Sequence, residues 1–287
     1  MHDPRDLAGR SFLITGSSAG IGRVTAETLA RRGATVFMAN RSEAKTRPVL
    51  DAIRAAGGDA TYLHVDLSDL ASVRRCAEEF LAKAHPLHVL INNAGVAGVR
   101  GLSRDGFQLT FATNHLGPFL LTLLLLPKLR AEPGARIVHV ASRAHVRVLG
   151  SGIDFDALRR PERRWGFGFP EYSVSKLCNV LFSAELARGR AGPNVHSYAL
   201  HPGVIASEVW REVPSLIRPL FTRRMKTPEQ GAVASLRCAT SPEVAADDGL
   251  YYDEDGSART PSRLARDEGL AKQLWERSVA WSGAPET

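Results

Sequence analysis

Tyr172 and Lys176 are separated by four positions in a stretch whose pattern predicts a helix. Residues at this spacing lie one turn apart on the same helix face. A phenol beside an ammonium group can exchange a proton with a substrate, because the cation favours the phenolate and lowers the pKa of the tyrosine. The pair therefore predicts acid–base chemistry, although the same spacing also arises by chance on exposed helices.

A glycine-rich turn lies near the start of the chain, between the apolar residues 11–15 and a helical pattern. Glycines at such a turn allow a close approach of the backbone to a pyrophosphate, and the helix N-terminus offers free N–H groups to phosphates. The predicted dinucleotide-binding loop comprises Gly16, Ser17, Ser18, Gly20, Ile21 and Gly22. The alternative is a glycine-rich turn that binds nothing.

The next apolar segment, 35–40, ends in Asn40 and is followed by Arg41. An acidic residue at this corner would bind the 2′-hydroxyl of an adenosine ribose and repel a 2′-phosphate. Arg41 instead offers a planar guanidinium suited to phosphate. The corner therefore favours NADP(H), and NAD(H) is the weaker expectation. A solvated arginine in a protein that uses both cofactors is the alternative.

The elements that must position these residues alternate between strand and helix. Strand patterns cover 11–15, 35–40, 61–65, 89–92, 136–141, 195–200 and 250–252, and helix patterns cover 20–32, 43–56, 70–84, 105–130, 171–188, 227–239 and 261–281. This alternation predicts an α/β fold, a single doubly wound Rossmann-type domain over residues 1–287 with a mainly parallel seven-stranded sheet. Ligands of such sheets bind at the carboxyl ends of the strands.

Further motifs stand at or near those strand ends: Asn92-Asn93-Ala94-Gly95, Ser142 and Pro202-Gly203. Asn114 interrupts the apolar helix pattern 105–130. Together with the glycine-rich turn and the Tyr172/Lys176 pair, they resemble the short-chain dehydrogenase/reductase family over nearly the whole chain. The separation of 30 positions between Ser142 and Tyr172 resembles the retinol dehydrogenase and WW-domain oxidoreductase branch. The sequence Lys-Thr-Pro-Glu-Gln-Gly-Ala at 226–232 and Gly-Leu-Tyr-Tyr at 249–252 strengthen that resemblance.

The resemblance implies roles for individual residues. Ser142, Tyr172, Lys176 and Asn114 would form the catalytic set, with Ser142 polarising a carbonyl and Asn114 holding a water that links Lys176 to solvent. Lys176 would also bind the nicotinamide ribose, next to Tyr172. The remaining cofactor contacts would come from Asn40, Arg41, Asp66, Leu67, Asn92, Ala94, Gly95, Pro202, Gly203, Ile205 and Ser207. For Asp66 a plain helix start, and for Asn114 an amide bound only by backbone, are the alternatives.

Two segments have no regular pattern, an irregular insertion at about 143–170 and an apolar stretch at about 204–226. Loops of this length are usually functional or disordered. The apolar stretch directly follows the nicotinamide motif, so we expect either a substrate lid or packing in the core. A lid of this composition predicts an apolar alcohol, aldehyde or ketone as substrate.

Composition limits the other function classes. The formal charge of +7 comes from scattered basic residues, which is unlike a nucleic-acid-binding face. The three cysteines have no metal-ligand spacing and suit a reducing compartment, so neither a metal site nor a disulfide is expected. No signal peptide is recognised, and the apolar run 119–126 is too short to cross a membrane. We therefore expect a cytoplasmic protein without a membrane span, and leave a homo-oligomer open.

The prediction is an oxidoreductase that transfers a hydride between NADP(H) and an apolar alcohol, aldehyde or ketone. A non-catalytic dinucleotide sensor with the same fold would be expected to lack part of the Ser142, Tyr172 and Lys176 set, which is complete here. An epimerase or dehydratase on this fold remains the other alternative.

Overall fold

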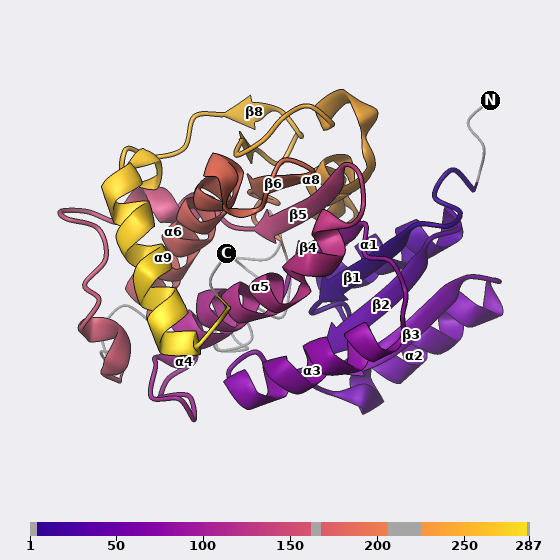
Figure 1. The fold of residues 1–287 in the computed structure, drawn as a ribbon, viewed down its shortest axis with the longest axis horizontal. Coiled ribbons are helices and arrows are strands. Elements are labelled where there is room, and N and C mark those ends of the chain that lie inside the picture. Colours follow the sequence, from indigo (N-terminus) through magenta and orange to yellow (C-terminus); the bar gives the residue numbers. More distant parts are fainter. Residues whose placement is uncertain (1–4, 162–167, 206–224, 286–287) are drawn as a thin grey trace.

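The computed structural model describes residues 5–161, 168–205 and 225–285. Its centre is one sheet in the order β3-β2-β1-β4-β5-β6-β7-β8, flanked by helices (Figure 1). Within this sheet, the strands β1 to β7 all pair in parallel, and β8 runs antiparallel to its neighbour β7. The strands are β1 (Ser11–Thr15), β2 (Thr35–Asn40), β3 (Asp59–His64), β4 (Val89–Asn92), β5 (Ala135–Val140), β6 (Val195–Leu200), β7 (Tyr251–Tyr252) and β8 (Ala258–Arg259).

The predicted doubly wound α/β fold is confirmed, with eight strands in the described residues rather than seven. The additional strand β8 consists of two exposed residues that pair with β7 through a short turn. Strands are recognised in a sequence by an apolar pattern that reports burial, and Ala258–Arg259 has none.

Helices cover both faces of the sheet and create two cores, because successive side chains of a strand point to opposite faces. Leu13 packs with α3, α5 and α6, whereas its neighbours Phe12 and Ile14 pack with α1, α2 and α8. Helix α9 lies outside α5 and α6 and completes the first core. The helices are α1 (Gly20–Arg31), α2 (Glu43–Ala55), α3 (Leu70–Ala82), α4 (Leu109–Phe111), α5 (Gly117–Arg130), α6 (Phe169–Glu185), α8 (Pro228–Thr240) and α9 (Glu268–Ser282).

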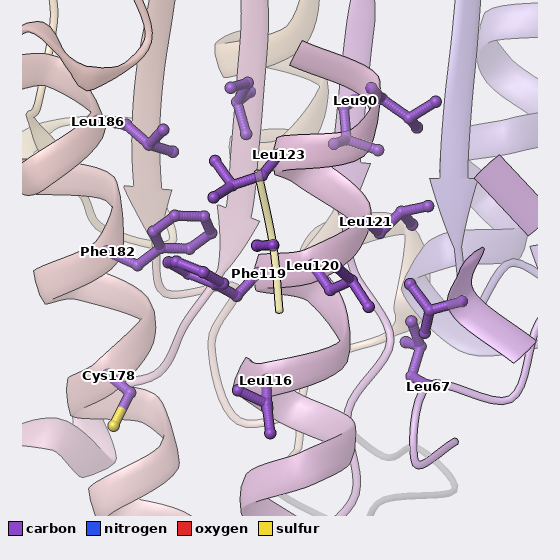
Figure 2. Packing of buried hydrophobic residues seen from close by; sticks show 14 of the residues in the cluster. Leu67, Leu90, Leu116, Phe119, Leu120, Leu121, Leu123, Cys178, Phe182 and Leu186 are labelled. Carbon is purple, nitrogen blue, oxygen red and sulfur yellow. The ribbon is translucent and has the colours of Figure 1, made fainter. Parts of the chain in front are cut away.

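The most apolar helix lies in the middle of the first core. Phe119, Leu120, Leu121 and Leu123 of α5 are fully or almost fully buried, and Phe119 faces Phe182 of α6 (Figure 2). The continuous helix Leu109–Arg130 is long and apolar enough to cross a membrane, but 83% of its most apolar window is buried inside the protein. A helix that is apolar on all sides fits a core position.

The N-terminus of α5 is pressed against the loop that follows β3. A Cβ atom on Gly117 would lie 2.2 Å from the carbonyl oxygen of Leu67, far inside contact distance. Gly117 therefore allows α5 and the loop to approach each other. This contact also sets the position of the helical turn that precedes α5, relative to the carboxyl ends of the strands.

We expect Gly117→Ala to lower the free energy of unfolding by about 1–3 kcal/mol, because the added methyl group meets backbone atoms that cannot move aside. Denaturant unfolding measures the change. Gly269→Ala in α9 is the matched control, since its Cβ would lie 3.4 Å from the Asp267 carboxylate, an ordinary contact. The control should lose no stability, and equal losses in both variants would refute the steric explanation.

Candidate active site

The loop between β1 and α1 has the shape that its glycines predict. Gly16 and Gly20 adopt positive φ angles of 71° and 56°. A Cβ on Gly16 would lie 2.7 Å from the Cα of Ala94, and one on Gly22 would lie 2.4 Å from the carbonyl oxygen of Gly16. The glycines thus let the loop fold tightly and pass directly beside the end of β4.

Two residues without a predicted role, Thr15 and Asn93, hold this loop against β4. The hydroxyl of Thr15 accepts hydrogen bonds from the backbone N–H groups of Asn93 and Ala94, both at 3.1 Å. The amide of Asn93 donates to the carbonyl oxygens of Thr15 and Gly16, both at 2.9 Å. Thr15 precedes the first glycine and Asn93 lies within the Asn-Asn-Ala-Gly motif. These positions beside known motifs are the feature of the sequence that could have indicated their role.

Asn40 supports the loop from the other side. Its side-chain oxygen accepts from the backbone N–H of Ser17 at 2.7 Å, and its nitrogen donates to the Ser17 hydroxyl at 3.1 Å. Because Asn40 is buried and both of its polar atoms are used, the structure gives it a role in shaping the loop. Ser18 is partly buried within the same loop.

The loop and Arg41 form a site suited to phosphate groups. The residue before α1 is Ala19, whose side chain caps no N–H group, and the first turn of the helix has no acidic residue. Uncapped N–H groups at a helix N-terminus attract anions. Arg41 is exposed and makes no hydrogen bond or ion pair with any residue in the described part of the chain. These features fit a dinucleotide whose pyrophosphate meets α1.

The loop after β3 brings Asp66 and Leu67 to the same sheet edge. The Asp66 carboxylate accepts from the backbone N–H and the hydroxyl of Ser68, at 3.0 and 2.7 Å. Helix α3 is capped instead by Asp69, which accepts from the N–H groups of Ala71 and Ser72. The helix-start alternative for Asp66 is therefore wrong, and Leu67 is buried beside Gly117.

The Asn-Asn-Ala-Gly motif divides its residues between the core and the site. Asn92 is buried in the core, where its amide donates to the Thr122 hydroxyl at 3.0 Å. Ala94 lies against Gly16, and a Cβ on Gly95 would lie 3.3 Å from the Lys176 amine. Ala94 and Gly95 thus stand where the sequence places them, whereas the Asn92 side chain points into the core.

Ser142 lies two residues after the end of β5 and caps the short helical turn Arg143–Arg147. Its Oγ accepts a hydrogen bond from the backbone N–H of Ala144 at 3.1 Å. A hydroxyl carries one proton and two acceptor positions. Because Ala144 uses only an acceptor position, the Ser142 hydroxyl can still donate its own proton to another oxygen.

Helix α6 carries Tyr172 and Lys176 on one face, as their spacing predicts. The Lys176 Nζ lies 5.6 Å from the centre of the Tyr172 ring and donates to the carbonyl oxygen of Val140 at 2.7 Å. Lys176 is only 3% exposed, and burial lowers its pKa to about 8. Ser142, Tyr172 and Lys176 are therefore brought together at the carboxyl end of β5.

The pKa of Tyr172 differs from the expectation drawn from the sequence. Burial raises it above the usual tyrosine value, and a hydrogen bond with the Ser142 side chain acts in the opposite direction. The predicted lowering of the Tyr172 pKa by Lys176 was wrong for this structure, because the loss of hydration outweighs the opposing hydrogen bond with Ser142. The tyrosine is thus held in its protonated form, ready to donate.

Asn114 lies in a π-helical turn, Ala112–Leu116, between α4 and α5. Its amide oxygen accepts from the N–H of Val96 at 2.8 Å, and its nitrogen donates to the Val96 carbonyl and to the Ser175 hydroxyl, both at 2.9 Å. The side chain therefore joins the π turn, the segment at Val96 and α6 beside Lys176. Two of its three hydrogen bonds go to backbone atoms, which agrees in part with the alternative of an amide bound only by backbone. A π turn of this kind is frequent at functional sites.

The loop after β6 closes the sheet edge. Pro202 and Gly203 are buried, and a Cβ on Gly203, with φ of 93°, would lie 2.6 Å from the Glu254 carboxylate. Ile205 is buried against α8, where a Cβ on Gly231 would lie 2.7 Å from its side chain. Ser207, most of the segment 204–226 and residues 162–167 of the insertion lie outside the described residues.

The described part of the chain contains no group of three or more His, Cys, Asp or Glu residues placed to hold a metal ion. All three cysteines are buried free thiols.

We expect Lys176→Met to raise the stability of the cofactor-free protein at pH 7 by about 1–2 kcal/mol, because it removes a buried charge at the cost of one hydrogen bond. The folded-state pKa is lowered, so the unfolded chain binds more protons between about pH 8 and the usual lysine pKa of 10.5. The wild type therefore regains stability as the pH rises through this range. Denaturant unfolding at pH 7 and pH 9.5 should show the advantage of the variant shrinking, and a constant difference would contradict the assignment.

Comparison with known proteins places this site in a family. A family model described as short chain dehydrogenase matches residues 10–152. Retinol dehydrogenase 12 of Mus musculus is 41% identical over 96% of this chain and 87% of its own length. The crystal structure of an uncharacterized protein from Mycobacterium paratuberculosis superposes with a TM-score of 0.78 at 34% identity, over 99% of this chain and 97% of that one.

A Pseudomonas aeruginosa RhlG/NADP active-site complex has a TM-score of 0.70 at 26% identity, and covers 90% of this chain and 99% of that one. The fold, the arrangement of Ser142, Tyr172 and Lys176, and these likenesses agree. This chain belongs to the short-chain dehydrogenase/reductase family, within its retinol dehydrogenase-like branch.

Proposed function

We propose that this protein is an NADP(H)-dependent oxidoreductase that interconverts an apolar alcohol and the corresponding aldehyde or ketone. The observation that carries the proposal is the convergence of the Ser142 hydroxyl, the Tyr172 phenol and the buried Lys176 amine at the carboxyl end of β5. When bound, the nicotinamide cofactor supplies or accepts the hydride.

The protein residues then handle the oxygen and its proton. The proton of the Ser142 hydroxyl can be donated to a carbonyl oxygen, which polarises the carbonyl and stabilises the developing alkoxide. Tyr172, kept protonated by burial, donates its proton to that oxygen in reduction and accepts it in oxidation. Lys176 has further N–H groups besides the one bound to Val140, and these suit the ribose hydroxyls of a nicotinamide nucleotide.

Two observations on this chain support the choice of NADP(H) over NAD(H). Arg41 is exposed with no partner among the described residues, and no acidic side chain ends β2. The RhlG structure, at 26% identity, holds NADP in its active site. A guanidinium suits the 2′-phosphate that distinguishes NADP from NAD.

The apolar substrate is supported by likeness and by composition. The relative from Mus musculus is named for retinol, an apolar alcohol, and is similar over almost the whole of this chain. The apolar stretch at 204–226 directly follows Pro202 and Gly203 at the edge of the site. The three buried free thiols suit a reducing compartment, and we propose a cytoplasmic location on that basis.

We expect Tyr172→Phe to lower turnover by about 10²–10⁴-fold and to leave cofactor binding nearly unchanged, because it removes only the proton-bearing oxygen. The assay follows NADPH absorbance with a panel of apolar and small charged aldehydes and ketones. Tyr198→Phe is the control, since it removes a buried hydroxyl that donates to Val244, away from the site. Wild-type turnover in Tyr172→Phe, or a preference for small charged carbonyls, would contradict the proposal.

Arg41→Ala should weaken NADP(H) binding by about 1.5–3 kcal/mol and leave NAD(H) binding nearly unchanged, because one charge-assisted phosphate contact is lost. Titration of each cofactor against the protein measures both affinities. Arg47→Ala removes an equal charge from α2, where Arg47 pairs with Glu43, and serves as the control. Equal losses for the two cofactors in Arg41→Ala would show that the arginine does not read the 2′-phosphate.

A further inference from the structure

The turn that carries Ser142 is anchored by a buried histidine whose position the proposed chemistry does not use. His145 lies three residues after Ser142 and is only 1% exposed. Its Nδ1 lies 2.7 Å from the backbone carbonyl oxygen of Ser142, and its Nε2 lies 3.2 Å from the backbone nitrogen of Ser262. One imidazole ring thus joins the Ser142 backbone to a segment more than a hundred residues later in the chain.

The partners of the ring determine which of its nitrogens carries the proton. The backbone N–H of Ser262 can only donate, so Nε2 must be the unprotonated acceptor. The proton of the neutral ring is then on Nδ1 and is donated to the carbonyl oxygen of Ser142. Burial lowers the pKa of His145, which favours this neutral form.

The same late segment holds the turn at a second point. Arg143 donates to the buried carboxylate of Asp253 at 2.5 Å, and Arg259 of β8 approaches the same carboxylate at 3.3 Å. The ring of Tyr251 packs edge-on against His145, with centroids 5.0 Å apart. Arg143 and His145 of the turn are therefore fixed to the β7–β8 hairpin and to the loop that follows it.

We propose that His145 is a positioning residue that sets the place of the Ser142 hydroxyl by holding the Ser142 backbone against Ser262. The inference rests on the proposed role of Ser142 in polarising the substrate. The direction of the Ser142 hydroxyl is set by the local turn, because its oxygen accepts a hydrogen bond from the backbone N–H of Ala144. A shift of the turn therefore also moves the proton that Ser142 donates. Misplacement of a catalytic group by about 1 Å can cost a factor of about 10² in rate.

Three variants test this inference. His145→Asn keeps an amide N–H close to the place of Nδ1 and should retain turnover within about threefold. His145→Gln moves the amide toward the place of Nε2, and His145→Leu removes both polar atoms; both should lose about 10–100-fold in kcat with little change in the KM for NADPH. If His145→Leu fails to fold, the comparison of Asn with Gln decides, and equal activities would overturn the inference.

His88→Leu is the matched control. The His88 ring also accepts a hydrogen bond from a backbone N–H, that of Ser11 at 3.0 Å, but at the amino ends of the strands, away from the site. It should lower stability without lowering kcat. If the His145 variants lose only stability, as this control does, His145 is structural and the inference is wrong.

A readout without substrate separates this inference from the proposed function. The ¹³Cζ resonance of Tyr172, assigned by its loss in Tyr172→Phe, reports the hydrogen bond between Tyr172 and Ser142. In His145→Leu it should move to the position seen in Ser142→Ala, and in His145→Asn it should stay near that of the wild type. No movement would overturn the positioning role. A wild type that reduces no carbonyl, with the resonance moving as expected, would refute the proposed function alone.

Discussion

The site depends on the burial of one ammonium group. The Lys176 amine is held between α6 and β5 by the carbonyl of Val140, with so little solvent around it that its pKa falls to about 8. A buried cation disfavours further positive charge in its neighbourhood. His139 shows this directly, since burial and Lys176 together lower its pKa to about 3 and keep the ring neutral. The amine can approach the site from this side because Gly95 has no side chain there.

The same requirement explains why polar but uncharged groups surround the lysine. Asn114 uses its whole side chain on Val96 and Ser175, and this fixes the π turn beside α6. Turned so that its nitrogen faces them, the Asn179 amide donates to the carbonyl oxygens of Asn114 and Ser175 at 2.8 and 3.1 Å. The Asn179 amide thus satisfies the backbone carbonyl of Asn114 within the π turn.

The sequence was sufficient wherever a residue's role follows from its neighbours along the chain. The glycines of the first turn and the Tyr172/Lys176 pair belong to local motifs, and the structure places them as predicted. The roles of Asn92 and Asn93 could not be separated, because the direction in which a strand's last side chain points depends on how the whole sheet packs. The direction of the Tyr172 pKa depended on burial, which distant segments supply.

The hydrogen bonds of Thr15 have a consequence for the order in which the chain folds. Thr15 ends β1, which lies in the sheet between β2 and β4, and its hydroxyl binds residues 93 and 94. Until β4 has been synthesised, one edge of β1 is open, and an apolar strand with an open edge tends to pair with other chains. Contacts between parallel strands so distant in sequence also form slowly. Release of a chain that ends before β4 would therefore favour aggregation. The pairing of β4 with β1 covers this open edge and, through Thr15, also completes the cofactor loop.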